Sequence, residues 1–306
     1  MMNYHAEGVR RHSAHYTREA LRRAQMAGAL LESRALSLDG EKALHFDLDG
    51  IPAVMPHDEC ADGVREGNVR DIALITRVGR SCCFLVQQVP ENGPVLVSRA
   101  AAQKRCKAEY LDTLSPGDLL PCRVTHIEPF GAFCDVGCGI SALLPIDSLS
   151  VSRIATPADR VSVGQDIRCV LRCRDAQGRL VLSMKELLGT WEENAALFSA
   201  GETVVGIVRS VETYGVFVEL APNLAGLAEC TPGVQRGQLV SVYIKSILPQ
   251  RSKIKLVILH AIEDASFRFP LRSFVSESHI DRWVYSQSPG GRVIETVFTQ
   301  PAAPAG

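Results

Sequence analysis

The strongest constraint in the sequence is an internal repeat. The segment that starts at Ser115 reads SPGDLLPCRVTHIEPFGAFCDV, and the segment that starts at Ser199 reads SAGETVVGIVRSVETYGVFVEL. Both begin with a glycine and an acidic residue, continue as an alternating strand, and pass through aromatic-Gly-x-Phe into a second strand. The two starting points lie 84 residues apart (199 minus 115). A repeat of that length indicates that each unit is about one small domain.

The first copy contains five segments with the alternation and the flanking turn residues of β-strands. Three of them lie near Leu119–Ile127, Ala132–Val136 and Ile140–Leu144, and Gly131 is expected to relieve a bend between the first two. A longer connection, Pro145–Gly164, leads to two further segments, DIRCVLRCRD and RLVLSMK. Five strands with a long connection between the third and the fourth predict a small closed Greek-key barrel.

The fourth of these segments alternates between two kinds of side chain. Its apolar positions are Ile167, Cys169, Leu171 and Cys173, and the positions between and after them are Arg168, Val170, Arg172 and Arg174. A period of two predicts a half-buried strand with one apolar face and one face that is mostly arginine. The arginine face either meets phosphate groups or is an ordinary solvated surface, and the sequence leaves both interpretations open.

Composition limits the class of protein. The 306 residues are 46% hydrophobic and 22% charged, which predicts a folded chain of several small domains. A formal net charge of -1 argues against binding nucleic acid by bulk electrostatics, so any such site is expected to be local. No apolar run approaches the roughly 18 to 20 residues of a membrane span, and the first residues lack the apolar run of a signal peptide. We therefore expect a cytoplasmic protein without membrane contact.

The ten cysteines favour a structural role. None forms a CxxC pair, and most stand singly inside apolar segments. Cys134 with Cys138, and Cys169 with Cys173, are four residues apart, which on a strand places both on one face. Small buried thiols are the simpler interpretation, and a metal site is the alternative. We expect neither a metal nor a cofactor.

At PFGAF, LLPIDSL, VGQDI and RDAQGRLVLSMKEL the chain resembles the S1 RNA-binding domain family, whose pattern is FGAFV, GLxHISEL, VGDxVxVKV and D-x-x-x-RxxLSxK. The order, spacing and turn residues agree over residues 115–188. The second copy keeps TYGVF, AGLAE and SVYIKSIL, but its loop is shorter and its ending lacks LSxK. The series of barrels is similar to the interior of bacterial ribosomal S1 proteins, in which earlier barrels dock to the small ribosomal subunit and later ones hold messenger RNA.

The resemblance implies a mainly β fold of tandem five-stranded OB-fold (S1-type) barrels with a short N-terminal helix, for which Thr17 is the candidate N-cap. The expected divisions are a basic helical arm over 1–26, a degenerate S1-like barrel over 27–108, an S1 domain over 115–188, a linker over 189–199, a divergent S1 domain over 200–262, and an extension of unknown role over 263–306. The basic residues of the arm are Arg10, Arg11, Arg18, Arg22 and Arg23. They belong either to an ordinary soluble helix or to an arm that touches ribosomal RNA.

Members of the family stack bases on two aromatic residues of the second strand, and the resemblance assigns these roles to Phe130 and Phe133. It assigns the Asp/Arg pair that flanks the last turn to Asp175 and Arg179. The family's third-strand histidine is replaced by Pro145. Taken alone, two phenylalanines beside a glycine are more often core residues than a binding platform, and the barrel frame is what favours the platform.

In the second copy the aromatic positions are Tyr214 and Phe217, the histidine position is Glu229, and Lys253 is an approximate counterpart of the arginine. Cations near the aromatic residues are expected to meet the phosphate groups. The expected cations are Arg123, Arg172, Arg174 and Arg179 in the first copy and Arg209, Lys245, Arg251 and Lys253 in the second.

The leading hypothesis is a non-enzymatic protein that binds single-stranded RNA, acts in translation and associates with the small ribosomal subunit. One alternative is a protein-interaction scaffold whose barrels no longer bind RNA, as the replacements at Pro145 and Glu229 and the near-zero charge suggest. Another is an RNA-binding regulator of RNA decay or transcription that does not bind ribosomes. Enzyme hypotheses are weaker, because the histidines are scattered and the sequence contains no nucleophile elbow and no glycine-rich phosphate loop.

Overall fold

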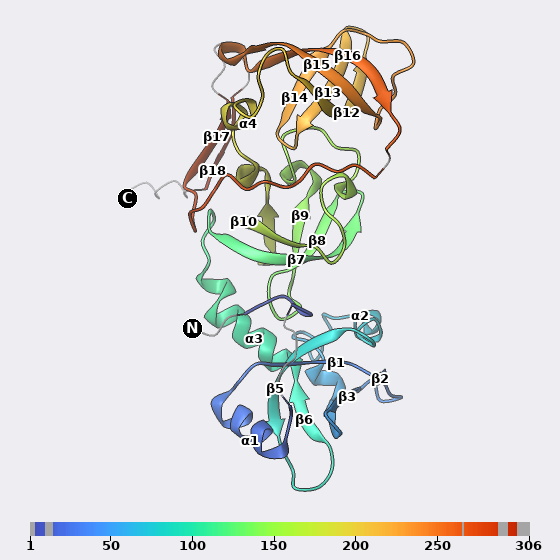
Figure 1. Cartoon of the computed structure of the whole chain (residues 1–306). Coiled ribbons are helices and arrows are strands. Elements are labelled where there is room, and N and C mark those ends of the chain that lie inside the picture. Colours follow the sequence, from blue (N-terminus) through green and yellow to red (C-terminus); the bar gives the residue numbers. More distant parts are fainter. Residues whose placement is uncertain (1–3, 10–14, 265, 287–292, 299–306) are drawn as a thin grey trace, which may run out of the picture. The chain divides into compact units, whose positions relative to one another are not determined.

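The computed structural model describes residues 4–9, 15–264, 266–286 and 293–298 (Figure 1). The chain divides into two compact units. Unit 1 comprises residues 1–114 together with 135–141, and unit 2 comprises residues 115–134 together with 142–306. Of the predicted basic arm, Arg10 and Arg11 lie outside the described residues.

Unit 1 opens with helix α1 (Arg18–Ala27), which begins where the sequence predicts. The Thr17 hydroxyl accepts a hydrogen bond from the Ala20 backbone N–H, so it satisfies one of the donors left free in the first turn. The helix ends at Gly28, whose left-handed backbone lets its N–H reach back to carbonyls of the last turn. Leu21 is the residue of α1 that enters the core of unit 1.

The sheet of unit 1 has six strands in the order β1-β5-β6-β4-β3-β2. The strands are β1 (Leu31–Arg34), β2 (Ser37–Leu38), β3 (Leu44–Leu48), β4 (Ile51–Met55), β5 (Ser81–Gln88) and β6 (Val95–Ser98). β1 and β2 follow one another in the chain and form the two ends of this order: β1 pairs with β5, and β2 pairs with β3. Between them, the N–H of Ala35 donates to the Arg80 carbonyl, and the N–H of Leu36 donates to the His45 carbonyl. One interrupted strand thus touches both edges, as the first strand of a barrel does. The other elements are η1 (His57–Glu59), α2 (Asp71–Ile75), α3 (Arg99–Glu109) and η2 (Leu111–Thr113).

The first barrel of unit 2 is closed, with strand order β10-β11-β9-β8-β7. Its strands are β7 (Leu119–Glu128), β8 (Gly131–Asp135), β9 (Ser141–Pro145), β10 (Asp166–Arg174) and β11 (Leu180–Ser183). The short helical turns η3 (Ile146–Ser148) and η4 (Pro157–Asp159) lie in the long connection between β9 and β10. The predicted fold class, tandem five-stranded barrels in a mainly β chain, is confirmed.

Two residues of β10 depart from the predicted alternation. Cys173, expected on the apolar face, is exposed, because the pairing of β10 with β11 shifts between Leu171 and Cys173 and leaves Arg172 as the extra residue of a bulge. Val170, expected on the outer face, is fully buried because Phe298 and Leu187 pack against it. Phe298 comes from a distant part of the sequence, so the local pattern does not reveal this contact.

The second barrel of unit 2 is also closed, with strand order β12-β13-β14-β16-β15. Its strands are β12 (Thr203–Glu212), β13 (Gly215–Ala221), β14 (Leu224–Ala228), β15 (Leu239–Leu248) and β16 (Lys253–Ile262), with the turn η6 (Pro249–Arg251) before the last. The two barrels are joined through η5 (Lys185–Leu188) and α4 (Trp191–Ala195). The third and fifth strands pair in parallel in both barrels, β9 with β11 and β14 with β16.

The C-terminal extension is part of unit 2. After β16 the chain runs back along the first barrel, where the Leu119 N–H donates to the Ser278 carbonyl at 2.9 Å and the Phe274 N–H to the Leu187 carbonyl at 2.8 Å. It then forms the hairpin of β17 (Arg282–Ser286) and β18 (Ile294–Val297). Two large side chains of β17, Trp283 and Tyr285, join the core of the second barrel. The extension therefore covers surface on both barrels.

One attachment point of the extension is a histidine held between two aspartates. The His279 imidazole hydrogen-bonds Asp118 at 2.6 Å and Asp281 at 3.3 Å, and the bond to Asp118 raises the pKa of His279 above its ordinary value of 6.5. A raised histidine pKa stabilises the folded contact below the ordinary value, and this contribution is lost as the pH rises through the raised pKa.

We therefore expect the extension to detach more readily as the pH rises from about 6 to about 8. The measurement is the hydrogen-exchange protection factor of the Ile280 amide, which donates to the Gly117 carbonyl. Protection, corrected for intrinsic exchange, should fall across this range in the wild type and stay flat in His279→Gln. An equal fall in both proteins would show that His279 does not hold the extension.

Most of the cysteines are buried, as predicted: eight of the ten lie inside the two units, and Cys173 and Cys230 are exposed. Over the part of the chain that the structure describes, no group of three or more histidine, cysteine or acidic side chains could hold a metal ion. None of the helices in the described ranges is long and apolar enough to cross a membrane.

Candidate nucleic-acid interface

The predicted aromatic pair of the first barrel lies on its outer surface. Phe130, in the turn between β7 and β8, is 56% exposed, and Phe133 on β8 is half-buried. Their rings meet edge to face with centroids 6.0 Å apart. His126 on β7 stacks on Phe133 with centroids 6.4 Å apart. Phe130 thus offers a free face that a base can stack on, while Phe133 is held in place by its two neighbours.

Glycine is required beside this pair because β8 and β9 approach closely there. A Cβ atom on Gly131 would lie 2.6 Å from the carbonyl oxygen of Leu144 and 3.1 Å from the Cα of Pro145. Leu143 on β9 is in turn paired with Val181 on β11. Half-buried side chains on β8, β9 and β11 therefore form one outer face of the barrel, and the Phe130–Phe133 pair lies at its edge.

Asp175 and Arg179 form the pair that the sequence predicts. The Arg179 Nε donates to the Asp175 carboxylate at 2.7 Å, and the backbone N–H of Arg179 donates to the same carboxylate at 2.9 Å. The aspartate's hydrogen bonds with the arginine side chain and backbone lower the pKa of Asp175 against the effect of desolvation, so it stays ionised. Asp175 thus fixes a largely exposed guanidinium at the turn before β11.

The other arginines of this barrel also have acidic or polar neighbours. Arg123 donates twice to Asp166, at 2.7 and 2.8 Å. Arg172 donates to the hydroxyl of Ser148 at 3.0 Å and lies 4.0 Å from the Asp147 carboxylate. Arg174 is exposed at the end of β10. A phosphate group would therefore compete with carboxylates for Arg123 and for Arg172.

The second barrel repeats the aromatic arrangement. Tyr214 is 68% exposed, Phe217 is half-buried, and their rings meet edge to face with centroids 6.1 Å apart. Phe217 is paired with Leu227 on β14, and Leu227 is paired with Lys255 on β16, so the three side chains lie in one row. Lys255 was missed at the sequence level. The signal that finds it is the parallel pairing of β14 with β16, which local alternation does not reveal.

The predicted cations of the second barrel have different environments. Lys253 is exposed at the start of β16, and Lys245 is exposed at an irregularity of β15 that matches the bulge at Arg172 in β10. Arg209 instead is buried, because a bulge in β12 turns it toward Glu219, to which its Nε donates at 2.7 Å. Glu229 is exposed just after β14.

A cavity of about 520 Å³ adjoins the Tyr214–Phe217 pair. Its wall includes Arg251 from η6 and Tyr285 from the C-terminal extension, and it also includes Arg153 from the long connection of the first barrel. Arg153 was missed at the sequence level, because the residues that surround it come from segments far apart in the chain. Aromatic and cationic groups around one hollow are the usual lining of a site for single-stranded nucleic acid.

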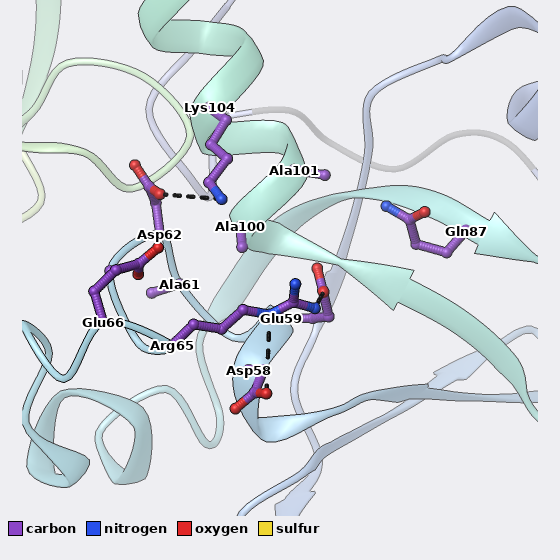
Figure 2. Close-up of a pocket in the computed structure, with 11 residues that line it drawn as sticks. Asp58, Glu59, Ala61, Asp62, Arg65, Glu66, Gln87, Ala100, Ala101 and Lys104 are labelled. Atoms are coloured by element: carbon purple, nitrogen blue, oxygen red, sulfur yellow. Dashed lines mark hydrogen bonds and ion pairs between the residues drawn. The ribbon is translucent and has the colours of Figure 1, made fainter.

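A cavity in unit 1 has a different character. It measures about 220 Å³, and Figure 2 shows its charged side chains directed at one another. Arg65 pairs with Glu59 and lies 3.8 Å from Asp58, while Lys104 lies 3.8 Å from Asp62. The lining has four acidic side chains, Asp58, Glu59, Asp62 and Glu66, against the two basic ones, so the cavity offers no net attraction to an anion.

Comparison with known proteins agrees with this geometry. Residues 113–185, which contain the first barrel of unit 2, match the family model described as the S1 RNA binding domain. The match includes the aromatic pair and the Asp175–Arg179 pair. The predicted membership of this segment in the S1 RNA-binding domain family is therefore confirmed.

The chain is also homologous to small ribosomal subunit protein bS1. It is 33% identical over 187 residues to bS1 of Staphylococcus aureus (strain COL), covering 55% of this chain and 47% of that protein. It is 34% identical over 187 residues to bS1 of Staphylococcus haemolyticus, with the same coverage. The chain thus spans about half the length of the curated relatives it matches.

Among solved structures, the chain is similar to a multidomain protein with nucleic acid binding domains from Streptococcus pneumoniae. The match covers 76% of this chain and 74% of that protein. Sequence identity is 14% and the TM-score is 0.25.

Proposed function

We propose that this protein is a non-enzymatic, cytoplasmic, single-stranded RNA-binding protein that acts in translation and associates with the small ribosomal subunit. The observation that carries the proposal is the pair of exposed aromatic platforms, Phe130–Phe133 and Tyr214–Phe217, at matching positions of two S1-type barrels. Every base has a π-face, so stacking on such platforms contributes roughly 1 to 3 kcal/mol per base without demanding a particular sequence. The homology to bS1 supports messenger RNA as the ligand and the small subunit as the partner.

The first test is a titration of a fluorescent, unstructured RNA of about 12 nucleotides, with duplex DNA as the control. We expect binding that prefers the single strand, tolerates changes of sequence and weakens as salt is raised, because phosphate contacts release counterions. Equal affinity for duplex DNA, or no binding at low salt, would contradict the proposal. Co-sedimentation with ribosomes before and after RNase treatment then separates a ribosome-associated protein from a regulator that binds RNA alone.

Removing an aromatic ring tests the platform directly. We expect Phe130→Ala and Phe133→Ala each to weaken RNA binding by roughly 1 to 3 kcal/mol. Phe130 is the more exposed residue, so its replacement should leave the midpoint of urea unfolding almost unchanged. Phe133 also packs on His126, and its replacement should cost a little more stability. A large stability loss with unchanged RNA binding would identify both rings as core residues.

The second candidate is a protein-interaction scaffold. The observation that favours it is the pairing of Arg123, Arg172 and Arg179 with carboxylates, together with the acidic Glu229 beside the second platform. Such a scaffold would show no salt-dependent RNA affinity, and the backbone amides beside its aromatic faces would gain protection from hydrogen exchange only when a protein partner is added.

A further inference from the structure

Two cavities of unit 2 share one loop, and the second of them adjoins the Tyr214–Phe217 platform. The first cavity, of about 640 Å³, is lined by Ile146 and Asp147 in η3, just after β9, and by Lys185, Arg236 and Glu295. The second is the cavity of about 520 Å³ at the Tyr214–Phe217 pair. The residues Val151, Ser152 and Arg153 line both, so the two hollows lie on either side of one short loop. We call residues Val151–Arg153 the divider loop.

The first cavity lies next to the turn that carries Phe130. The backbone N–H of Ile146, which lines this cavity, donates to the carbonyl of Phe130 at 2.9 Å. Arg172, near the same end of the barrel, lies 4.0 Å from Asp147. The first cavity therefore begins one backbone hydrogen bond away from the turn that carries Phe130, and the divider loop separates it from the second cavity at Tyr214.

Cations without a carboxylate partner gather along this surface. Within the described residues, the side chains of Arg153, Lys185, Arg236 and Arg251 have no hydrogen bond or ion pair, and all four line one or both cavities. Arg123, Arg172 and Arg179 on the barrel itself are engaged with carboxylates. A phosphate group gains a new charge-assisted contact at the four cations that line the cavities. At the three arginines on the barrel it must displace an existing contact with a carboxylate.

The two barrels are also held together in a fixed arrangement around the divider loop. The Asn223 side chain, from the turn between β13 and β14, accepts from the Val151 N–H at 2.9 Å and donates to the Lys185 and Gly189 carbonyls, each at 2.8 Å. A ligand that reaches from one platform to the other thus meets both without first ordering a flexible linker, which increases the gain from the second contact.

We propose that one RNA strand runs from the Phe130–Phe133 platform across the divider loop to the Tyr214–Phe217 platform, with Arg153 as the central phosphate contact. This inference rests on the proposed function and specifies how the two barrels share one ligand. Lys185 and Arg236 contact the strand on the side of the first barrel, and Arg251 contacts it on the side of the second.

The test compares oligouridines of about 6 and about 18 nucleotides, labelled with fluorescein, in anisotropy titrations of the full chain. The longer RNA should bind the wild type at least roughly tenfold more tightly than the shorter one, because it engages both platforms. Arg153→Ala should weaken binding of the longer RNA roughly five- to tenfold and lower its salt slope by about 0.7, the value for one phosphate contact with a single strand. Binding of the shorter RNA should change by less than about twofold, since it can occupy one platform alone.

Arg80→Ala is the matched control, because it removes the same charge from an exposed residue of unit 1 that lines neither cavity. A second readout is photocrosslinking of the longer RNA with a central 4-thiouridine, which should label the divider loop. Equal effects of Arg153→Ala and Arg80→Ala, or crosslinks that all lie elsewhere, overturn the shared path. If Phe130→Ala still weakens binding in that case, the proposed function stands, whereas absence of RNA binding by the wild type rejects both.

Discussion

Glu219→Gln should destabilise unit 2 by about 3 to 5 kcal/mol, because it leaves two buried guanidinium groups without their counter-charge. The Glu219 side chain is 0% exposed and lies between Arg160, from the long connection of the first barrel, and Arg209, from β12. Arg160 is 1% exposed, and its Nε also donates to the Ser150 hydroxyl at 3.1 Å. The remaining carboxylate near this cluster, Asp159, lies 3.5 Å from Arg209 and cannot neutralise both cations.

The measurement is the free energy of unfolding in urea, combined with hydrogen exchange of residues 148–162. Glu263→Gln is the control, because it makes the same chemical change at an exposed glutamate and should alter stability by less than about 0.5 kcal/mol. The triple variant Glu219→Leu, Arg160→Met, Arg209→Met should recover much of the loss, since uncharged side chains of similar size need no counter-charge. A loss below about 1 kcal/mol for Glu219→Gln would place the cluster in contact with solvent.

This cluster also links stability to the path proposed for RNA. Arg160 and the divider loop belong to the same connection between β9 and β10, and Glu219 anchors that connection to β13. Loss of the anchor should therefore raise exchange in the divider loop before it affects the strands. Binding of long RNA should weaken in Glu219→Gln more than binding of short RNA.

The sequence predicts features that depend on neighbours close in the chain. The alternation in residues 119–128 and 166–174 and the turn after Asp175 place the strands of the first barrel to within a residue or two. The pair Asp175–Arg179 was predicted from the family resemblance, and its contact spans only four residues. The strands need only the period of a strand and the geometry of a turn.

Other features depend on contacts between distant segments, and local patterns do not contain them. Val170 is buried because Phe298 covers it, and Arg209 leaves the outer surface because Glu219 and a bulge draw it inward. Arg153 gains its position at two cavities from segments that lie on both sides of it in the sequence. Residue type alone predicts these arginines as equivalent surface cations, whereas the fold gives them different roles.

Glu7→Gln should destabilise unit 1 by about 3 to 5 kcal/mol for the same physical reason. The Glu7 carboxylate receives hydrogen bonds from the Arg99 Nε at 2.6 Å and from Arg77 at 2.8 Å, and the Cys83 backbone N–H donates to it at 3.1 Å. The side chains of Glu7 and Arg99 are both almost fully buried. Removing the negative charge leaves Arg99 in the interior without its partner.

The pH dependence of unit 1 should change with this substitution. Burial acts to raise the pKa of Glu7, but Arg99 and Arg77 outweigh it and hold the pKa below the ordinary value of 4.5. A lowered carboxyl pKa contributes stability that is present above the ordinary value and is lost as the pH falls through the lowered pKa. We expect Glu7→Gln to remove this acid-dependent loss, while Glu19→Gln, at an exposed position of α1, should retain it.

The pKa of Asp135, a buried neighbour of Glu7, depends on the charge of Glu7. Burial raises the pKa of Asp135 to about 6, and the negative charge of Glu7 adds to the rise. Asp135 therefore destabilises the folded state as the pH rises from its ordinary value of 3.8 through about 6, which is the opposite sign to Glu7. In Glu7→Gln the pKa of Asp135 should fall, measurable by carbon-detected NMR titration of its carboxyl group. Because the Glu7 backbone N–H donates to Asp135 at 2.8 Å, an unchanged pKa would show that this hydrogen bond and burial, rather than the carboxylate, set the titration of Asp135.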